Sequence, residues 1–345
     1  WMFLSSFENL RKEILENQHI DNMLHLGPRT FDELSGEVVQ NTAYVIANHS
    51  SVYGGDYYRL VDGKNCSDKE RLFFECRKGI YYANIKQRNF EKIPGRPFGY
   101  WVSEKMTGVF SNTQIGDLFP VRKGMDTSDN ALYLRLWFEV SSEKMGIKQC
   151  DDSSFSEHIM RWAPYNKGGQ LRKWYGNYEY VVDWGKHGTN IQATGGTLRS
   201  KYLYFKDAIT WNALSSQRTT ARFSNQGAIF DSAGSSMFPE KEDIFNVLGY
   251  INSPIVAAIL NLINPSLNFG AGTMATIPLV QKNNKVIDNY VEDNVVLSKS
   301  DWDAHETSWD FQTNELLKIE DDVYRTFFDA YEDEIRERYG RIDGD

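Results

Sequence analysis

Residues 92–101, which read Lys-Ile-Pro-Gly-Arg-Pro-Phe-Gly-Tyr-Trp, constrain the fold more than any other part of this 345-residue chain. The two prolines and two glycines in this segment exclude a helix and a central strand, because proline lacks the amide donor that both structures need. The hydrophobic pattern also changes from one side of the segment to the other. We therefore expect a domain boundary here, and the length of the chain is typical of about two domains.

The first 92 residues have the pattern of an α/β unit. Residues 42–47 (Thr-Ala-Tyr-Val-Ile-Ala) predict a buried strand, because β-branched and aromatic side chains favour strands. A second short strand is expected at 57–61, and a helix follows from Ser67, whose spacing to Glu70 is that of a capping box. This order of elements is typical of the back part of a doubly wound sheet rather than of a complete one.

After the boundary the pattern changes to short strands and turns, and the chain ends in an acidic segment. Residues 183–196 are polar and rich in glycine, which favours an exposed loop. Residues 244–263 predict two short helices with a break at Pro254. From Ser298 onwards apolar residues recur every three or four positions among many acidic ones, which predicts amphipathic helix.

The formal net charge of −9 is the sum of two regions of opposite sign. Residues 231–345 carry 9 Lys or Arg and 22 Asp or Glu, whereas residues 161–230 carry 10 basic and 3 acidic residues together with 13 aromatic ones. An acidic average argues against nucleic acid as a partner, but a basic and aromatic-rich stretch supplies phosphate contacts and stacking surfaces. The alternative for these aromatic side chains is ordinary core packing.

Two segments carry the best candidates for such contacts. Residues 162–175 place basic side chains among tryptophans and tyrosines, and Gly168 with Gly169 allows a partner to approach the backbone closely. Residues 123–130 (Lys-Gly-Met-Asp-Thr-Ser-Asp-Asn) form a turn-rich loop whose polar side chains suit base edges, or which simply links two strands.

Several classes of site are excluded by what the sequence lacks. It has no glycine-rich phosphate loop, no G-x-S-x-G motif and no H-E-x-x-H motif. Its three cysteines include no C-x-x-C pair, which argues against a zinc site or disulfide scaffold and for a reducing, cytoplasmic setting. No apolar run reaches the roughly 18 residues of a membrane span. Because the chain begins with Trp1 and has no signal peptide, we expect a piece of a longer protein.

Motifs along nearly the whole chain are jointly specific, although each alone is common. They lie at residues 3–11, 25–33, 36–45, 93–97, 100–103, 124–130, 162–175, 209–211, 268–269, 277–278, 297–302 and 307–309. Together they resemble the PglX-type adenine-specific DNA methyltransferases of BREX phage-defence systems. They are also similar to the methylase-specificity parts of type IIG restriction-modification enzymes.

The resemblance implies a division of the chain into three parts. Residues 1–92 would be the C-terminal part of a Rossmann-like α/β methyltransferase domain. Residues 93–297 would be a mixed α+β target-recognition domain, and residues 298–345 the start of an acidic helical spacer. The implied reaction transfers a methyl group from S-adenosylmethionine to N6 of an adenine flipped out of the duplex. The cofactor loop and the Asn-Pro-Pro-Tyr motif would lie before Trp1, so this piece is expected to hold no cofactor, metal or catalytic residue and to be inactive alone.

The implied partners are double-stranded DNA, the catalytic half of the same chain and other phage-defence subunits, with no membrane. Because the resemblance provides no code at the level of residues, we choose the DNA contacts by their chemistry, as phosphate-binding cations, base-reading polar groups and stacking rings. These residues are Arg122, Lys123, Thr127, Asn130, Lys167, Arg172, Lys173, Trp174, Tyr175, Arg218 and Arg222. The alternatives are the equivalent part of a type IIG enzyme with a fused endonuclease, and a protein-interaction platform built on the acidic tail.

Overall fold

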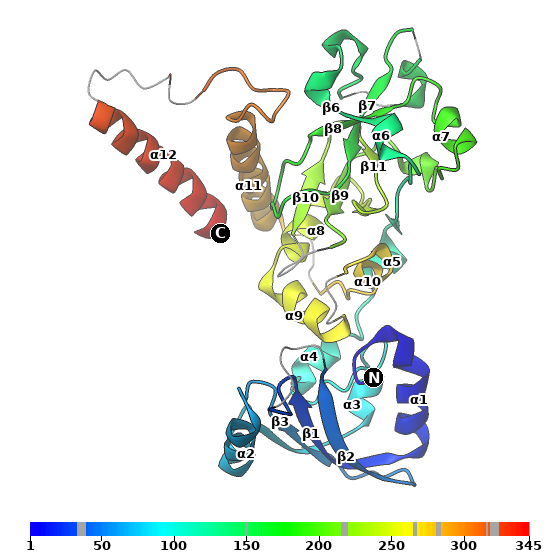
Figure 1. The fold of residues 1–345 in the computed structure, drawn as a ribbon, viewed down its shortest axis with the longest axis vertical. Helices are drawn as coiled ribbons and strands as arrows, with labels where there is room; N and C mark the ends of the chain where they lie inside the picture. Colours follow the sequence, from blue (N-terminus) through cyan, green and yellow to red (C-terminus); the bar gives the residue numbers. More distant parts are fainter. Residues whose placement is uncertain are drawn as a thin grey trace. The chain divides into compact units, whose positions relative to one another are not determined.

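The computed structural model describes residues 1–32, 39–148, 151–156, 158–214, 220–264, 268–280, 284–314, 317 and 324–344. It is a mixed α/β structure with several small sheets, as the sequence predicts at that coarser level (Figure 1). The chain divides into two compact units. Unit 1 is Trp1–Thr113 with Leu260–Ser266, and unit 2 is Gln114–Ile259 with Leu267–Asp345.

Unit 1 is built on one mixed sheet. Its elements in chain order are η1 (Ser5–Phe7), α1 (Glu8–Asn17), β1 (His19–Gly27), β2 (Asn41–Ala47), β3 (Gly55–Arg59), α2 (Cys66–Glu75), β4 (Tyr81–Ile85), α3 (Arg88–Glu91) and α4 (Glu104–Val109). The strand order is β2-β1-β3-β4. β1 pairs in parallel with β3 and antiparallel with β2, while β3 and β4 are antiparallel. A mixed sheet of this kind does not by itself identify the back part of a Rossmann-like domain, so that assignment stays a prediction.

Two local predictions for unit 1 are wrong in detail. The strand expected at 42–47 forms as β2, but it lies at the edge of the sheet and is not buried, since Tyr44 and Val45 are 47% and 53% exposed. Strand propensity does not say whether a strand is central or lies at an edge. Helix α2 begins after Asn65, whose side chain accepts a hydrogen bond from the amide of Asp68, so Ser67 is not its N-cap.

The proline- and glycine-rich segment 92–101 is held against α1 by Arg11. The side chain of Arg11 is 1% exposed, and its Nε and Nη2 donate to the carbonyl oxygen of Gly95 at 2.9 and 2.6 Å. Its Nη1 donates to the carbonyl oxygens of Trp1 and Leu4, both at 2.7 Å. The segment is therefore a packed part of unit 1, whose contacts continue to Thr113, while the functional division at residue 92 stays a prediction.

Unit 2 combines two small sheets with helices that lie before, between and after their strands in the chain. Its short helices are α5 (Ile115–Leu118), α6 (Asn130–Tyr133), η2 (Trp137–Glu139), η3 (Ser142–Lys144), η4 (Asp152–Ser154), α7 (Thr189–Ala193), η5 (Lys201–Leu203), α8 (Ile244–Ile251), α9 (Pro254–Ile263, which ends in unit 1) and α10 (Ala271–Ala275). Its strands are β5 (Val121–Arg122), β6 (Leu134–Leu136), β7 (Trp162–Asn166), β8 (Tyr180–Asp183), β9 (Ala208–Trp211), β10 (Ala221–Ser224), β11 (Ile229–Phe230) and β12 (Ser236–Met237). The longer helices are α11 (Lys285–Asp303) and α12 (Tyr324–Gly344). The sheets have the orders β10-β9-β12-β5 and β11-β7-β8-β6.

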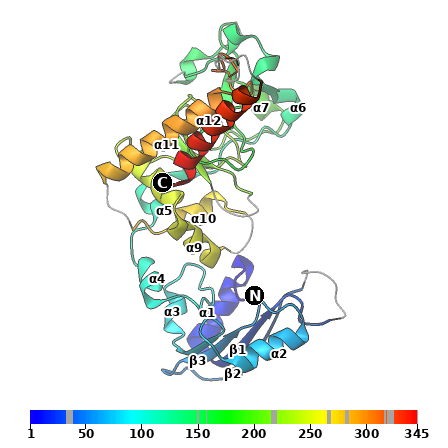
Figure 2. The same ribbon diagram turned by 90° about the vertical axis from the view of Figure 1, so that its left-hand side faces the viewer.

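Unit 2 confirms some of the predicted elements and corrects another. The two helices expected at 244–263 form as α8 and α9, with the break before Pro254. The exposed loop expected at 183–196 is wrong, because Trp184 and Ile191 are fully buried in the core and the segment contains α7. The residues from Ser298 onwards do not begin a new helix, since α11 starts at Lys285 and runs through this position. Figure 2 shows α11 and α12 lying side by side.

The described residues offer neither a membrane-spanning helix nor a cluster of metal ligands. No single helix in this part of the chain is long and apolar enough to cross a membrane. The pair α8 and α9 reaches that length and composition only together, and it is bent by 64° at its break. The same residues contain no group of three or more His, Cys, Asp or Glu side chains that could hold a metal ion.

Replacing Arg11 with Met is expected to lower the free energy of unfolding of unit 1 by about 3–5 kcal/mol. Methionine keeps an apolar stem of similar length but leaves three carbonyl oxygens without their buried donor, at about 1–3 kcal/mol each before relaxation. Urea unfolding followed by tryptophan fluorescence measures the loss. The exposed Arg88→Met change is the control and is expected to alter stability by less than about 0.5 kcal/mol. Equal stability of the two variants would contradict the role of Arg11.

Candidate nucleic-acid interface

The residues predicted to contact DNA differ in their exposure. The exposed ones are Arg122, Lys123 and Asn130. The half-buried ones are Lys167, Arg172 and Lys173. The buried ones are Thr127, Trp174, Tyr175 and Arg222. Arg218 lies outside the described residues.

The aromatic residues at the end of the basic stretch form packing contacts inside unit 2. The backbone amide of Trp174 donates to the carbonyl oxygen of Ala221 at 3.0 Å, and the Trp174 carbonyl accepts from the amide of Phe223 at 2.8 Å. The Tyr175 hydroxyl accepts a hydrogen bond from Nε2 of Gln226 at 2.9 Å. Trp174 and Tyr175 are 7% and 2% exposed, so in this structure they cannot stack on a base, and core packing describes them correctly.

Arg172 is paired with an acidic residue of α11. Its Nη1 lies 2.9 Å from Oδ2 of Asp301, whose side chain is only 2% exposed, and its guanidinium lies 5.1 Å from the centroid of the Trp302 ring. Nearby, Lys299 lies 5.3 Å from the ring centroid of Tyr175 and forms ion pairs with Asp303 and Asp310. Residues 231–345, which are acidic, thus neutralise at least one cation of the basic residues 161–230 within the fold.

Arg222 is a structural residue of the same region. It is 2% exposed, and its Nη2 donates to Oδ1 of Asn212 at 2.9 Å. Burial lowers the pKa of Arg222 to about 10, because charge is costly away from water. Asn212 in turn donates to the carbonyl oxygens of Gly169 and Gln170 at 2.7 and 3.1 Å. Arg222 therefore holds Asn212, which in turn holds the turn at Gly169 and Gln170. The burial of Arg222 argues against direct contact with DNA.

One group of exposed cations lies where the end of β5 meets the residues before and at the start of η5. The hydroxyl of Ser200 donates to the carbonyl oxygen of Lys123 at 3.5 Å, which brings the two stretches together. We name the resulting surface the basic ridge, which consists of Arg122, Lys123, Arg199 and Lys201. Lys201 is partly neutralised by Asp152 at 3.2 Å. Arg199 and Lys201 belong to no motif of the sequence, and only their place within the basic region 161–230 pointed to them.

The loop that follows β5 is held firmly at its base. The amide of Met125 donates to the carbonyl oxygen of Phe230 at 2.8 Å, and Asp126 exchanges two backbone hydrogen bonds with Thr197 at 3.0 and 2.8 Å. The buried Thr127 hydroxyl donates to Oδ1 of Asn130 at 2.6 Å. The loop tip, residues 128–130, is exposed beside the basic ridge.

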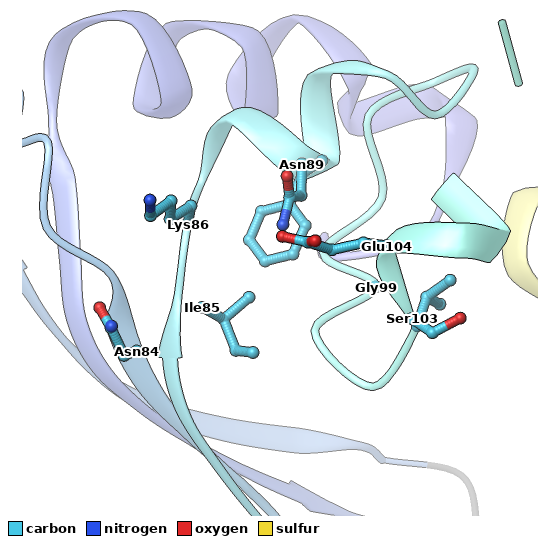
Figure 3. A pocket seen from close by; sticks show the side chains of 9 residues that line it. Asn84, Ile85, Lys86, Asn89, Gly99, Ser103 and Glu104 are labelled. Carbon is cyan, nitrogen blue, oxygen red and sulfur yellow. The ribbon is translucent and has the colours of Figure 1, made fainter. Parts of the chain in front are cut away.

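Unit 1 contains a hollow of about 400 Å³ between β4, α3 and the start of α4 (Figure 3). Lys86 and Glu104 line it with opposite charges, so it has no net preference for a phosphate or for a cation. The side chain of Asn84 is already engaged, because it accepts a hydrogen bond from the amide of Gly54 at 3.0 Å. The described residues offer no glycine-rich turn after a strand here. They do not fit an S-adenosylmethionine site.

The chain is similar over nearly its whole length to two curated adenine-specific methyltransferases. It is 36% identical to PglX of Lacticaseibacillus casei (strain Zhang), over 99% of this chain and 30% of that protein. It is 35% identical to BrxX of Escherichia coli O9:H4 (strain HS), over 99% of this chain and 28% of that protein. The resemblance indicated by the sequence motifs is thereby confirmed, and the chain spans less than a third of the length of these relatives. No family model matches the chain.

Two solved structures have a more distant likeness. The type IIL restriction-modification enzyme MmeI in complex with DNA is 14% identical, with a TM-score of 0.47 over 98% of this chain and 46% of that chain. The type IIG restriction endonuclease BpuSI is 10% identical, with a TM-score of 0.33 over 84% of this chain and 40% of that chain. Neither likeness is close enough to assign roles to residues.

Arg172→Ala is expected to lower the free energy of unfolding by about 2–3 kcal/mol, because it leaves the buried carboxylate of Asp301 without its cation. The half-exposure of Arg172 places the loss below that of a fully buried pair. Lys173→Ala removes a neighbouring charge that forms no ion pair among the described residues, and is the matched control. In a double-mutant cycle, Arg172→Ala and Asp301→Ala should lose less together than the sum of their separate losses.

Arg172→Ala and Lys173→Ala also test the alternative that residues 162–175 contact DNA directly. If Arg172→Ala left stability unchanged and reduced only the affinity for DNA, the structural role of the pair would be wrong. The residue would then belong to the DNA surface, as the sequence pattern alone suggested.

Proposed function

We propose that this chain is the DNA target-recognition part of an adenine-specific methyltransferase of phage defence. In this proposal the chain binds duplex DNA at a chosen sequence and presents an adenine to the catalytic half of the same protein. The catalytic half would bind S-adenosylmethionine and methylate N6 of the flipped adenine. Residues 1–92 would complete the methyltransferase domain, residues 93–297 would recognise the target and residues 298–345 would begin the spacer.

One observation carries the proposal, namely the 35–36% identity to adenine-specific methyltransferases over 99% of the chain. The similarity is continuous rather than limited to a short motif. Because the chain covers less than a third of these relatives, their activity is proposed for the whole protein and not for this part alone.

The surface of unit 2 supports the proposal through its charge. The basic ridge contains three exposed cations, Arg122, Lys123 and Arg199, and cations of this kind supply the sequence-independent part of DNA affinity. The loop tip beside it exposes Asn130, whose amide suits hydrogen bonding to base edges. In the proposed complex the ridge fixes the register on the phosphates and the tip reads bases.

Binding of this chain to duplex DNA is expected to weaken steeply as salt rises from 50 to 200 mM. The logarithm of the binding constant should fall with the logarithm of salt concentration by about 0.9 for each phosphate contacted. The double variant Arg122→Ala/Lys123→Ala should make this slope less steep by about 2 and weaken binding to all duplexes alike. Fluorescence anisotropy with labelled duplexes over a salt series measures both effects.

The double variant Arg88→Ala/Lys92→Ala removes two exposed charges from unit 1 and is the control, expected to leave the slope unchanged. Enrichment from a random duplex pool should return a motif that contains adenine. Absence of duplex binding at 50 mM salt, or tight binding that ignores salt, would contradict the proposed function.

A further inference from the structure

Unit 2 contains an open hollow of about 550 Å³ between α6, the β7–β8 pair and α7. Both views show α6 and α7 next to each other (Figures 1 and 2). The hollow lies directly beside the loop tip 128–130, since α6 begins at Asn130. The residues that determine its chemistry are Tyr133, Arg135, Arg161, Asp183, Asn190 and Thr194.

The walls of the hollow are joined by hydrogen bonds that keep its width constant. The Tyr133 hydroxyl is 2.8 Å from the carbonyl oxygen of Asn190 and 2.9 Å from Oγ1 of Thr194. The side chain of Ser128 donates to the carbonyl oxygen of Thr194 at 3.0 Å. Helix α6, the loop tip and the end of α7 are therefore fastened to one another, so the hollow is present before any ligand binds.

The charge of the hollow is positive. Arg161 forms a bidentate pair with Asp183, with Nε–Oδ1 and Nη2–Oδ2 distances of 3.0 and 2.6 Å, and these two charges cancel. Arg135 donates through Nη1 to the carbonyl oxygens of Ala131 and Leu134 at 2.8 and 2.6 Å. Within the part of the chain that the structure describes, Arg135 forms no ion pair. The lining thus keeps one uncompensated cation, held in place by two backbone carbonyls.

This combination of shape and charge fits one kind of ligand better than others. A concave surface receives a convex ligand, and the sugar–phosphate strand is the convex, negatively charged ridge of a duplex. A guanidinium is the side chain best suited to phosphate oxygens, and the Nε and Nη2 groups of Arg135 are not used by the two backbone carbonyls that hold its Nη1. Base edges lie inside a groove, so protruding segments such as the loop tip reach them more easily than a hollow does.

We propose that this hollow seats the sugar–phosphate backbone of one DNA strand, with Arg135 as the phosphate contact that sets the register of the loop tip. The inference rests on the proposed DNA-binding function and extends it to a site outside the basic ridge. With a strand seated between α6 and α7, Asn130 lies beside the adjacent groove. Its Oδ1 is engaged by Thr127, and its amide NH₂ group is the donor that it offers to base acceptors.

The test compares Arg135→Ala with Asn130→Ala in the 345-residue chain, using a panel of duplexes of different sequence. Arg135→Ala is expected to weaken binding to every duplex by a similar factor, about tenfold at the lower end for a charged hydrogen bond. It should also make the salt slope less steep by about 1. Asn130→Ala should leave the slope unchanged and alter the ranking of the duplexes.

Arg135→Lys keeps the charge and is expected to restore most of the salt slope. The midpoint of thermal unfolding of both Arg135 variants should lie within a few degrees of that of the original chain. Weaker DNA binding by Arg135→Ala would then reflect a lost phosphate contact and not a loss of folding. Arg88→Ala removes an exposed charge of unit 1; it is the control and should bind as the original chain does.

The outcomes separate this inference from the proposed function. If the original chain binds no duplex, the proposed function fails. If Arg122→Ala/Lys123→Ala weakens binding while Arg135→Ala does not, the function stands and the phosphate seat is wrong. If Arg135→Ala changes only the ranking of duplexes with an unchanged slope, Arg135 reads bases, and the seat is again wrong.

Discussion

The ion pair between Arg172 and Asp301 joins the two regions of opposite charge on which unit 2 depends. Asp301 is 2% exposed, so its carboxylate needs a cation within the fold. Arg172 provides it from the basic stretch and also packs over Trp302. Lys299 of α11 also lies 5.3 Å from the ring centroid of Tyr175, so two cation contacts attach α11 to the region around residue 175. Without Arg172, the buried carboxylate of Asp301 would lose the cation that the basic stretch provides.

This pairing changes what the charge distribution means for DNA binding. A basic region and an acidic region that lie apart in the sequence suggest one surface for DNA and another for something else. In the fold, the acidic residue Asp301 neutralises Arg172 of the basic stretch. The cations at the end of residues 162–175 therefore cannot all bind DNA phosphates together. The exposed cations of unit 2 include those of the basic ridge, and the half-buried Arg135 lines the hollow. The net charge of a stretch therefore gives only the number of cations that it contains. Their exposure in the fold decides which of them can contact DNA.

The elements that depend on near neighbours were predictable from the sequence. Pro254 divides two helices because it lacks an amide donor, and residues 42–47 form a strand because their side chains favour one. The burial of that strand was not predictable, since it depends on which strands lie beside it. The same holds for Arg172 and Lys173, which are indistinguishable by local pattern. Only Arg172 meets a carboxylate, and that carboxylate is 129 positions away.

The candidate site was predictable in part, because the turn-rich loop after β5 signalled exposed polar residues and Asn130 is exposed as expected. The sequence did not show that its base is clamped at Met125 and Asp126 by residues about 70 to 105 positions further along the chain. Gly124 is required at this base, since a Cβ there would lie 1.9 Å from the carbonyl oxygen of Phe230. The clamp at the base uses backbone atoms and a glycine, whereas the tip is held by side chains, since Ser128 donates to the carbonyl oxygen of Thr194 and Thr127 donates to Oδ1 of Asn130. Because both the base and the tip are fixed, the amide NH₂ group of Asn130 is held at a defined place, where it can offer a hydrogen bond to a base edge.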